Sequence, residues 1–141
     1  DLTAEVVRDG WVHTRDMARC DDEGYVYIVD RKHDMIISGG FNVYPKEVED
    51  VLTADPDVAA AAVIGIPDDR WGEAVTAVVV ARPGAVVDCT RLIALVKEKK
   101  GSHQAPKTVE LADSLPLTPV GKVDKKALRA RYWTGESRAV H

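Results

Sequence analysis

The chain has 141 residues, of which 45% are hydrophobic and 30% charged, and its formal net charge is −4. This length supports one modest domain with a real core, and the composition is that of an ordered globular protein. The negative charge argues against nucleic acid or an acidic membrane surface as the main partner. No apolar run approaches the length of a membrane span, and the first residues lack the composition of a signal peptide.

The two cysteines, Cys20 and Cys89, lie far apart in the sequence and do not have the spacing of metal ligands. We interpret them as two reduced thiols and therefore expect a cytoplasmic protein without a metal site in this chain.

The first thirty residues predict a β-hairpin. Residues 2–7 are expected to form a short helix or a lead-in, and residues 11–13 a strand. Residues 21–24 predict a turn, after which the alternating residues 25–29 return as a second strand. An isolated two-stranded hairpin is marginally stable in water, so we expect this one to pack on another segment or on a neighbouring copy.

A charged segment follows this hairpin. Residues 30–34 are all charged or titratable and lie between two apolar runs, so they cannot be core. We interpret them as either a solvated link or a working joint. Gly39 and Gly40 then predict a tight turn with positive φ, and Pro45 marks the first turn of a helix.

The remaining residues alternate between helical and strand patterns. We expect helices over 46–54, from Asp88 to about residue 100, and from Asp124 onward, the last with Ala127, Leu128 and Tyr132 facing inward. Residues 58–66 and 74–81 predict buried strands separated by a loop over 67–73, and 108–111 predict a short strand. The fold class is therefore α+β, with a central sheet of about three strands flanked by helices and preceded by the hairpin.

Four sites could carry chemistry, although each one alone favours a structural role. Lys122 follows a glycine in a Pro/Thr loop, where a mobile ammonium suits phosphate or carboxylate oxygens. Asp16 lies at a strand end, where a carboxylate can accept hydrogen bonds from ribose hydroxyls. Arg31 read by itself is a surface cation, and Trp71 is a lid over the core.

Three motifs change this interpretation because they occur together and in order. The chain reads GWVHTRDMA over 10–18, DEGYVYIVDRKHDMIISGGFNVYPKEVE over 22–49 and PLTPVGKVDKKALR over 116–129. In these motifs it resembles the C-terminal end of the adenylate-forming enzymes, which include acyl- and aryl-CoA synthetases, luciferases and adenylation domains of peptide synthetases. It is most similar to fatty-acyl and aryl-CoA ligases, where DRKxDMIISGG(E/F)NVYP and PDxxWGE are typical.

The resemblance implies a role for each candidate residue. Asp16 and Arg31 match the residues that contact the ATP ribose, and His33 matches the hinge about which the small domain swings between two half-reactions. Lys122 matches the lysine that enters the active site during adenylation.

Three further residues match positions that contact coenzyme A. Gly39 and Gly40 lie in the hairpin that lines the pantetheine channel, and Trp71 matches a tryptophan that packs on the CoA nucleotide in some aryl-CoA ligases.

The chain departs from the family pattern at three positions. Arg15 replaces a glycine that is usual in the ribose loop, and His33 replaces the usual Asp or Lys of the hinge. Ala105 stands where some relatives carry an arginine for a CoA phosphate, which puts that contact in doubt.

The resemblance also implies a longer protein. The phosphate loop, the Tyr-Gly-x-Thr-Glu motif and the acyl pocket of the family belong to a large N-terminal domain. We therefore expect residues 1–30 to be the terminal hairpin of that domain, 31–133 to be the mobile C-terminal domain, and 134–141 to be a frayed tail.

The whole protein is expected to use ATP and CoA to convert a carboxylic acid, fatty or aryl, into acyl-adenylate and then acyl-CoA, with Mg²⁺ bound outside this chain. Two alternatives stay open: an adenylation enzyme that loads a carrier protein, and a non-catalytic module of the same fold. The exposed hairpin also suggests a homodimer of this chain. The acid, its chain length and the pathway are not indicated by the sequence.

Overall fold

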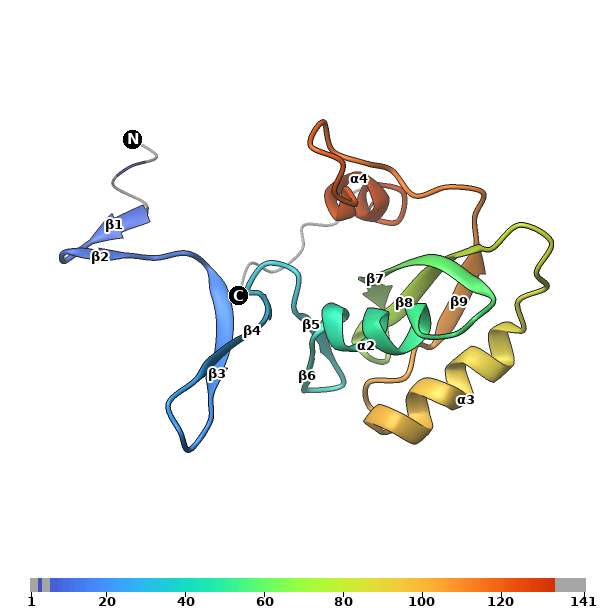
Figure 1. The fold of residues 1–141 in the computed structure, drawn as a ribbon, viewed down its shortest axis with the longest axis horizontal. Coiled ribbons are helices and arrows are strands. Elements are labelled where there is room, and N and C mark those ends of the chain that lie inside the picture. The colour runs from blue at the N-terminus through green and yellow to red at the C-terminus, as the bar shows by residue number, and fades with distance from the viewer. Residues whose placement is uncertain (1–2, 4–5, 134–141) are drawn as a thin grey trace.

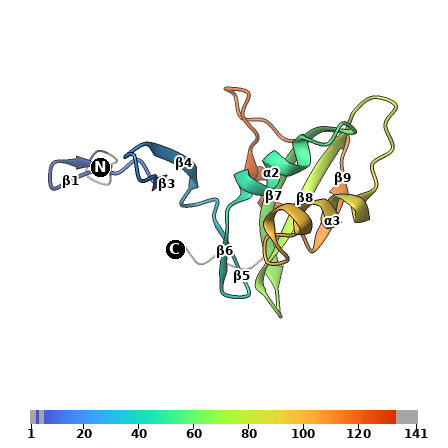
Figure 2. The same cartoon turned by 60° about the horizontal axis from the view of Figure 1, so that its bottom comes forward.

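The structure, a computed structural model, describes residue 3 and residues 6–133. Two small hairpins come first in the chain and extend away from a five-stranded sheet that carries helices α2, α3 and α4 (Figures 1 and 2). The predicted α+β class is confirmed. Residues 134–141, predicted to form a frayed tail, lie outside the described residues.

The N-terminal part contains two hairpins where one was predicted. Strand β1 (Val7–Arg8) pairs with β2 (Trp11–Val12), and β3 (Asp16–Cys20) pairs with β4 (Val26–Arg31). The prediction that residues 11–13 pair with 25–29 was therefore wrong.

The turn residues explain this pairing. Asp9 and Gly10 have φ of 52° and 80°, and such an Asp-Gly pair is a strong signal for a two-residue hairpin turn. The carboxylate of Asp21 accepts hydrogen bonds from the backbone N–H groups of Glu23 and Tyr25, so it closes the β3–β4 turn. Of the helix or lead-in predicted over 2–7, Val7 lies in β1, and most of the rest lies outside the described residues.

The sheet is built around the long hairpin of β7 (Val58–Asp68) and β8 (Gly72–Ala81). Its order is β6-β5-β8-β7, and β9 (Thr108–Leu111) pairs in parallel with β8. The sheet has five strands rather than about three because the short hairpin of β5 (Ile36–Ser38) and β6 (Phe41–Val43) joins β8 through the Ser38–Gly72 pair.

The loop predicted over 67–73 is shorter than expected. Strand β7 continues to Asp68 and β8 begins at Gly72, so only residues 69–71 lie outside the ladder. Two side-chain hydrogen bonds make this tight turn possible: the Asp68 carboxylate accepts from the N–H groups of Arg70 and Trp71, each at 2.9 Å.

The helices cover both faces of the β7–β8 hairpin. On one face, Val63, Val75 and Val79 pack with α2 (Pro45–Thr53) and α3 (Cys89–Lys100). On the other face, Ala62, Ile64 and Val78 pack with Leu128 of α4 (Lys125–Ala130). This alternation follows from the period of two along a strand, and it confirms that these strands are buried on both sides.

The buried residues and the caps of the helices are as the sequence predicts, except at Ala127. Val48, Val51 and Leu52 are buried on α2, and the carboxylates of Asp88 and Asp124 accept cap hydrogen bonds at the start of α3 and α4. Leu128 is fully buried and Tyr132 is half-buried, but Ala127, predicted to face inward, is exposed. Leu128 alone faces the core within α4 because the helix is six residues long and presents a narrow face to the sheet.

Two polar contacts reinforce the packing of the five-stranded sheet with helices α2, α3 and α4, which we call the sheet body. Arg91 of α3 donates two hydrogen bonds to the buried carboxylate of Asp55, at 2.7 and 3.0 Å. Burial alone would raise the pKa of Asp55, but these bonds and one from the Asp57 N–H hold that pKa below its usual value. Burial, together with a hydrogen bond to Glu110, raises the pKa of Tyr132 to about 12.

Within the part of the chain that the structure describes, no helix is long and apolar enough to cross a membrane.

Candidate functional site

Asp16 and Arg31 lie opposite each other at the end of the β3–β4 ladder. Their positions pair across the two strands, and Nε of Arg31 lies 3.5 Å from Oδ1 of Asp16. Asp16 and His33 both line an open pocket of about 540 Å³ at this end of the hairpin. The structure thus brings together the three residues predicted for the ribose contact and the hinge.

The two departures from the family pattern at this pocket touch each other. Arg15 has a φ of 64°, a region that glycine adopts without strain and other residues rarely enter. Its guanidinium donates a hydrogen bond of 3.5 Å to Nε2 of His33, and its carbonyl accepts one of 2.9 Å from the Lys32 N–H. Arg15 therefore joins the loop predicted to contact ribose to the position predicted to be the hinge.

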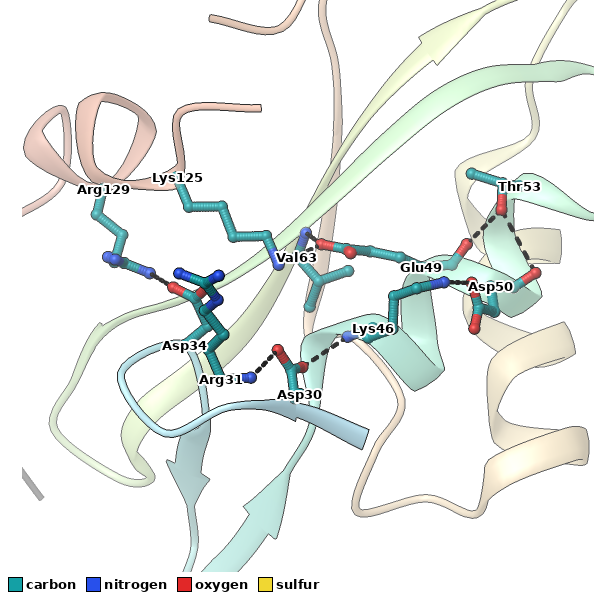
Figure 3. Close-up of polar contacts among 10 residues, drawn as sticks. All are labelled: Asp30, Arg31, Asp34, Lys46, Glu49, Asp50, Thr53, Val63, Lys125 and Arg129. Carbon is teal, nitrogen blue, oxygen red and sulfur yellow. Dashed lines mark hydrogen bonds and ion pairs between the residues drawn. The ribbon is translucent and has the colours of Figure 1, made fainter. Parts of the chain in front are cut away.

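The segment around His33 is a compact turn fixed on both sides. The N–H groups of Asp34 and Met35 both donate to the carbonyl of Arg31. On the β4 side, the carboxylate of Asp30 accepts from the N–H groups of Arg31 at 2.7 Å and Lys46 at 2.9 Å (Figure 3).

Asp30 therefore supplies a cap hydrogen bond to the start of helix α2 from another part of the chain. Tyr44, which occupies the cap position, makes no side-chain cap bond. We refer to residues 30–34 as the joint. Sequence reasoning singled out its charges but not this capping role, because the partner N–H lies 16 residues away.

Gly39 and Trp71 are in direct contact. The Gly39 N–H donates to the carbonyl of Trp71 at 2.9 Å, and a Cβ added to Gly39 would lie 2.8 Å from Cε3 of the indole ring. Gly40 also has positive φ, 82°, but a Cβ there would meet open space. Glycine is thus required at position 39 both by the backbone and by the packing of the ring.

The β5–β6 hairpin is held in place by a buried carboxylate. Glu73 is 6% exposed and accepts a hydrogen bond of 2.9 Å from the N–H of Ile37. Strand β5 pairs with β8 only at Ser38, so this side chain satisfies a backbone donor that the ladder leaves open.

Cations surround the Trp71 ring. The guanidinium of Arg70 lies 4.8 Å from its ring centroid and the ammonium of Lys107 lies 4.5 Å from it, both within the range of cation–π contacts. Trp71 and Lys107 line a small pocket of about 210 Å³, together with Ser38, Phe41, Ser102 and His103. Sequence reasoning missed Arg70, Lys107 and His103, because nothing in the sequence shows which residues surround the ring.

Ala105 is 5% exposed and packs in the core with α2 and α3. It makes no charged contact, so the nearby positive charge comes from Lys107 instead.

The backbone of Lys122 is fixed while its side chain projects into solvent. The N–H of Thr118 donates to the Lys122 carbonyl at 2.7 Å, the Gly121 N–H donates to the Thr118 carbonyl at 2.8 Å, and Gly121 has a φ of 79°. This is a tight turn followed by a glycine bulge. Among the described residues, no carboxylate lies within ion-pair distance of the Lys122 ammonium.

The structure does not bring Lys122 together with Asp16 and Arg31. In Figure 1 the loop that precedes α4 lies on the far side of the sheet body from the β5–β6 hairpin, and β3 and β4 lie off to one side. Residues 3 and 6–133 contain no group of three or more His, Cys, Asp or Glu side chains that could hold a metal ion.

Comparison with known proteins identifies the fold. Residues 47–122 match the family model of the AMP-binding enzyme C-terminal domain. The chain belongs to this family. It is 56% identical to a medium/long-chain-fatty-acid–CoA ligase of Mycobacterium tuberculosis over 99% of its length, and 45% identical over its whole length to a fatty acid–[acyl-carrier-protein] ligase of Streptomyces coeruleorubidus.

A solved structure shows the same arrangement. The amide bond synthetase McbA from Marinactinospora thermotolerans matches 93% of this chain with a TM-score of 0.85 and 45% identity. The chain spans 26% and 27% of the two curated relatives and 27% of McbA. This AMP-binding enzyme C-terminal domain thus corresponds to about a quarter of each relative.

Replacing Gly39 and Gly40 separately by alanine tests the contact between Gly39 and the Trp71 ring. Gly40→Ala places a Cβ at positive φ in open space, which costs about 1–2 kcal/mol. Gly39→Ala adds overpacking against Trp71, for a further loss of about 1–3 kcal/mol. Urea unfolding of the purified chain measures both, and equal losses for the two variants would contradict the contact between Gly39 and the ring.

Proposed function

We propose that the domain is the C-terminal part of an ATP-dependent acid–CoA ligase. The complete enzyme converts a carboxylic acid and ATP into acyl-adenylate and pyrophosphate, then transfers the acyl group to the thiol of CoA and releases AMP. The observation that carries this proposal is that two different chemical surfaces belong to one sheet body. One is the loop before α4, which carries Lys122, and the other is the β5–β6 hairpin, whose Gly39 contacts Trp71; Figure 1 shows this loop and this hairpin on opposite sides of the body.

The proposed domain boundary lies at the joint. Residues 1–30 belong to a large nucleotide-binding domain, residues 31–133 form the mobile domain, and His33 is the residue about which the two rotate. The turn at 31–34 supports this assignment because β4 ends at Arg31 and the sheet body begins at β5. A short turn between two packed parts is where a large φ/ψ change can be absorbed.

In the adenylation step, the chain supplies charge and orientation. Asp16 accepts hydrogen bonds from the ribose hydroxyls of ATP, and Arg31, 3.5 Å away, contacts the same ribose while holding the carboxylate. The ammonium of Lys122 stabilises the negative charge that develops between the attacking carboxylate and the α-phosphate as pyrophosphate departs. The Mg²⁺ that accompanies ATP is expected to be held by residues outside this chain.

In the thioester-forming step, the body has rotated and presents its other side. Gly39 and Gly40 line the channel for the pantetheine arm, where the absence of side chains leaves room for a narrow ligand. The Trp71 ring packs on the adenine of CoA, and Arg70 and Lys107 neutralise its phosphates. Two cations beside one aromatic ring suit a nucleotide with several phosphates.

Free CoA and a carrier protein remain the two candidate acceptors, and one relative is itself a ligase of the second kind. The Arg70–Trp71–Lys107 group favours CoA, because a carrier protein presents the pantetheine arm without the nucleotide. A non-catalytic module of the same fold would show neither activity. With both cysteines free and ATP and CoA as substrates, we place the enzyme in the cytoplasm.

Substituting Lys122 separates the two half-reactions. In the full-length enzyme, Lys122→Ala should slow acyl-adenylate formation about a hundredfold or more, because a preorganised charge at the transition state is lost. CoA transfer from supplied acyl-adenylate should stay near normal, and acetylation of Lys122 should act like the substitution, since it removes the same charge.

The matched control is Lys126→Ala, which removes an exposed lysine four residues away. Adenylation at the normal rate by the Lys122→Ala variant would contradict the proposed mechanism.

We also propose that this chain, produced by itself, forms a homodimer through its N-terminal hairpins. Val26 and Ile28 of β4 are 66% and 64% exposed, and an open strand edge with apolar side chains favours pairing with a copy. Sedimentation should show a dimer that Ile28→Lys converts to monomer. A monomer at all concentrations would exclude this assembly.

A further inference from the structure

Two ion pairs tie helix α4 to the joint and to helix α2. Nη1 of Arg129 lies 3.0 Å from Oδ1 of Asp34, and Nζ of Lys125 lies 2.8 Å from Oε1 of Glu49. The four side chains are 15% to 24% exposed, so these pairs are far less solvated than an ordinary surface pair. Figure 3 shows both cations pointing from α4 toward the joint and α2.

These pairs are polar restraints on α4 that add to its contacts with the sheet. The helix has six residues, too few for independent stability, and its one buried residue is Leu128. Residues next to the helix hold it on the sheet as well: Val123 and Tyr132 pack beside Leu128, and Nε1 of Trp133 donates to the Gly65 carbonyl at 2.9 Å. Lys125 and Arg129 lie four residues apart on one side of the helix, so their two pairs restrain its rotation on the side that faces the joint and α2.

The Glu49 carboxylate is itself firmly placed. The same oxygen that receives Lys125 also accepts a hydrogen bond of 2.8 Å from the N–H of Val63 on β7. Glu49, the partner of Lys125, is therefore held both by its place on α2 and by its hydrogen bond to the central sheet.

The Lys122 loop is a direct extension of α4. The Asp124 N–H donates to the Pro116 carbonyl at 2.8 Å, Leu117 and Val123 form a β-bridge, and the Asp124 carboxylate caps the helix. Lys122 stands three residues before the first residue of the helix. A shift or rotation of α4 therefore moves the Lys122 backbone by a similar amount.

We propose that Arg129 and Lys125 are positioning residues for Lys122, and that the Arg129–Asp34 pair transmits the orientation of the joint to the Lys122 loop. Asp34 directly follows His33, so the pair is made by the first residue on the moving side of the hinge. The proposal rests on the proposed function of Lys122. A displacement of about 1 Å at a catalytic group can cost on the order of a hundredfold in rate.

The test uses the full-length enzyme with Arg129→Met, which keeps the length of the side chain and removes its charge. Adenylation kcat should fall about tenfold to a hundredfold. The KM for ATP should change by less than about twofold, because Asp16 and Arg31 are untouched. CoA transfer from supplied acyl-adenylate should also stay within about twofold, and this second half-reaction reports that the variant is folded.

Three comparisons separate positioning from general damage. Lys100→Met removes a half-exposed pair with Glu47 elsewhere in the domain and should leave both half-reactions unchanged. Arg129→Lys should retain most of the adenylation rate, because one guanidinium nitrogen makes the contact and an ammonium can replace it. In a Lys122→Ala background, Arg129→Met should cause no further loss, since it acts through Lys122.

The outcomes distinguish this proposal from the proposed function. Normal adenylation by the Lys122→Ala variant would overturn the function of Lys122 itself. Slow adenylation by that variant, with Arg129→Met at the rate of the Lys100→Met control, would overturn only the positioning role. Equal loss in both half-reactions, or a full additional loss in the Lys122→Ala background, would also overturn it.

Discussion

The pairing of β7 with β8 is the interaction on which the rest of the structure depends. Ten registered residue pairs join the two strands, from Val58–Ala81 to Asp68–Gly72, and both faces of the hairpin are buried. The turn end of this hairpin places Trp71 against Gly39, while one of its faces receives Leu128 and with it α4 and the Lys122 loop. Because a paired and buried hairpin is stiff, the two surfaces keep a constant relation, as the proposed rotation requires.

The sequence predicted those features that depend on local chemistry. Asp88 and Asp124 mark the starts of α3 and α4 through capping, and this rule acts within a few residues. The buried strands were also predictable, because long runs of Ala, Val and Ile occur only where both faces are covered. The Asp9–Gly10 hairpin turn carried the same kind of local signal and could have been found, but the apolar residues after it were assigned to a longer pairing.

Contacts between distant residues could not be predicted in this way. Asp30 caps a helix that begins 15 residues later, Glu73 satisfies the N–H of Ile37, and Arg129 meets Asp34 across 95 positions. The sequence offers many possible partners for each of these charged side chains, and only the fold determines which one it contacts. The motif resemblance assigned roles to Asp16, Lys122 and Trp71, whereas the contact of Lys107 with Trp71 became visible only when β8 and the segment before β9 were placed side by side.

The contact between Arg15 and His33 occurs beside a strained backbone position in the loop next to the joint. A residue other than glycine at φ of 64° costs free energy, on the order of 1 kcal/mol or more, unless its side chain gains contacts in return. Here the guanidinium lies 3.5 Å from Nε2 of His33, the residue about which rotation is proposed. The proposed rotation about His33 would change that contact.

A distance measurement across the joint tests this account most directly. One spin label in the full-length enzyme is placed at Cys20, exposed on β3, and the other at Val86→Cys, a 90% exposed position in the loop before α3, with Cys89 replaced by serine. The two labels report the distance between the hairpin and the sheet body. The account predicts one distance with ATP and acid, a different one with a non-reactive acyl-adenylate analogue and CoA, and a single distance under both conditions in His33→Pro. One unchanged distance in the unsubstituted joint under both conditions, in an enzyme that turns over normally, would contradict the rotation.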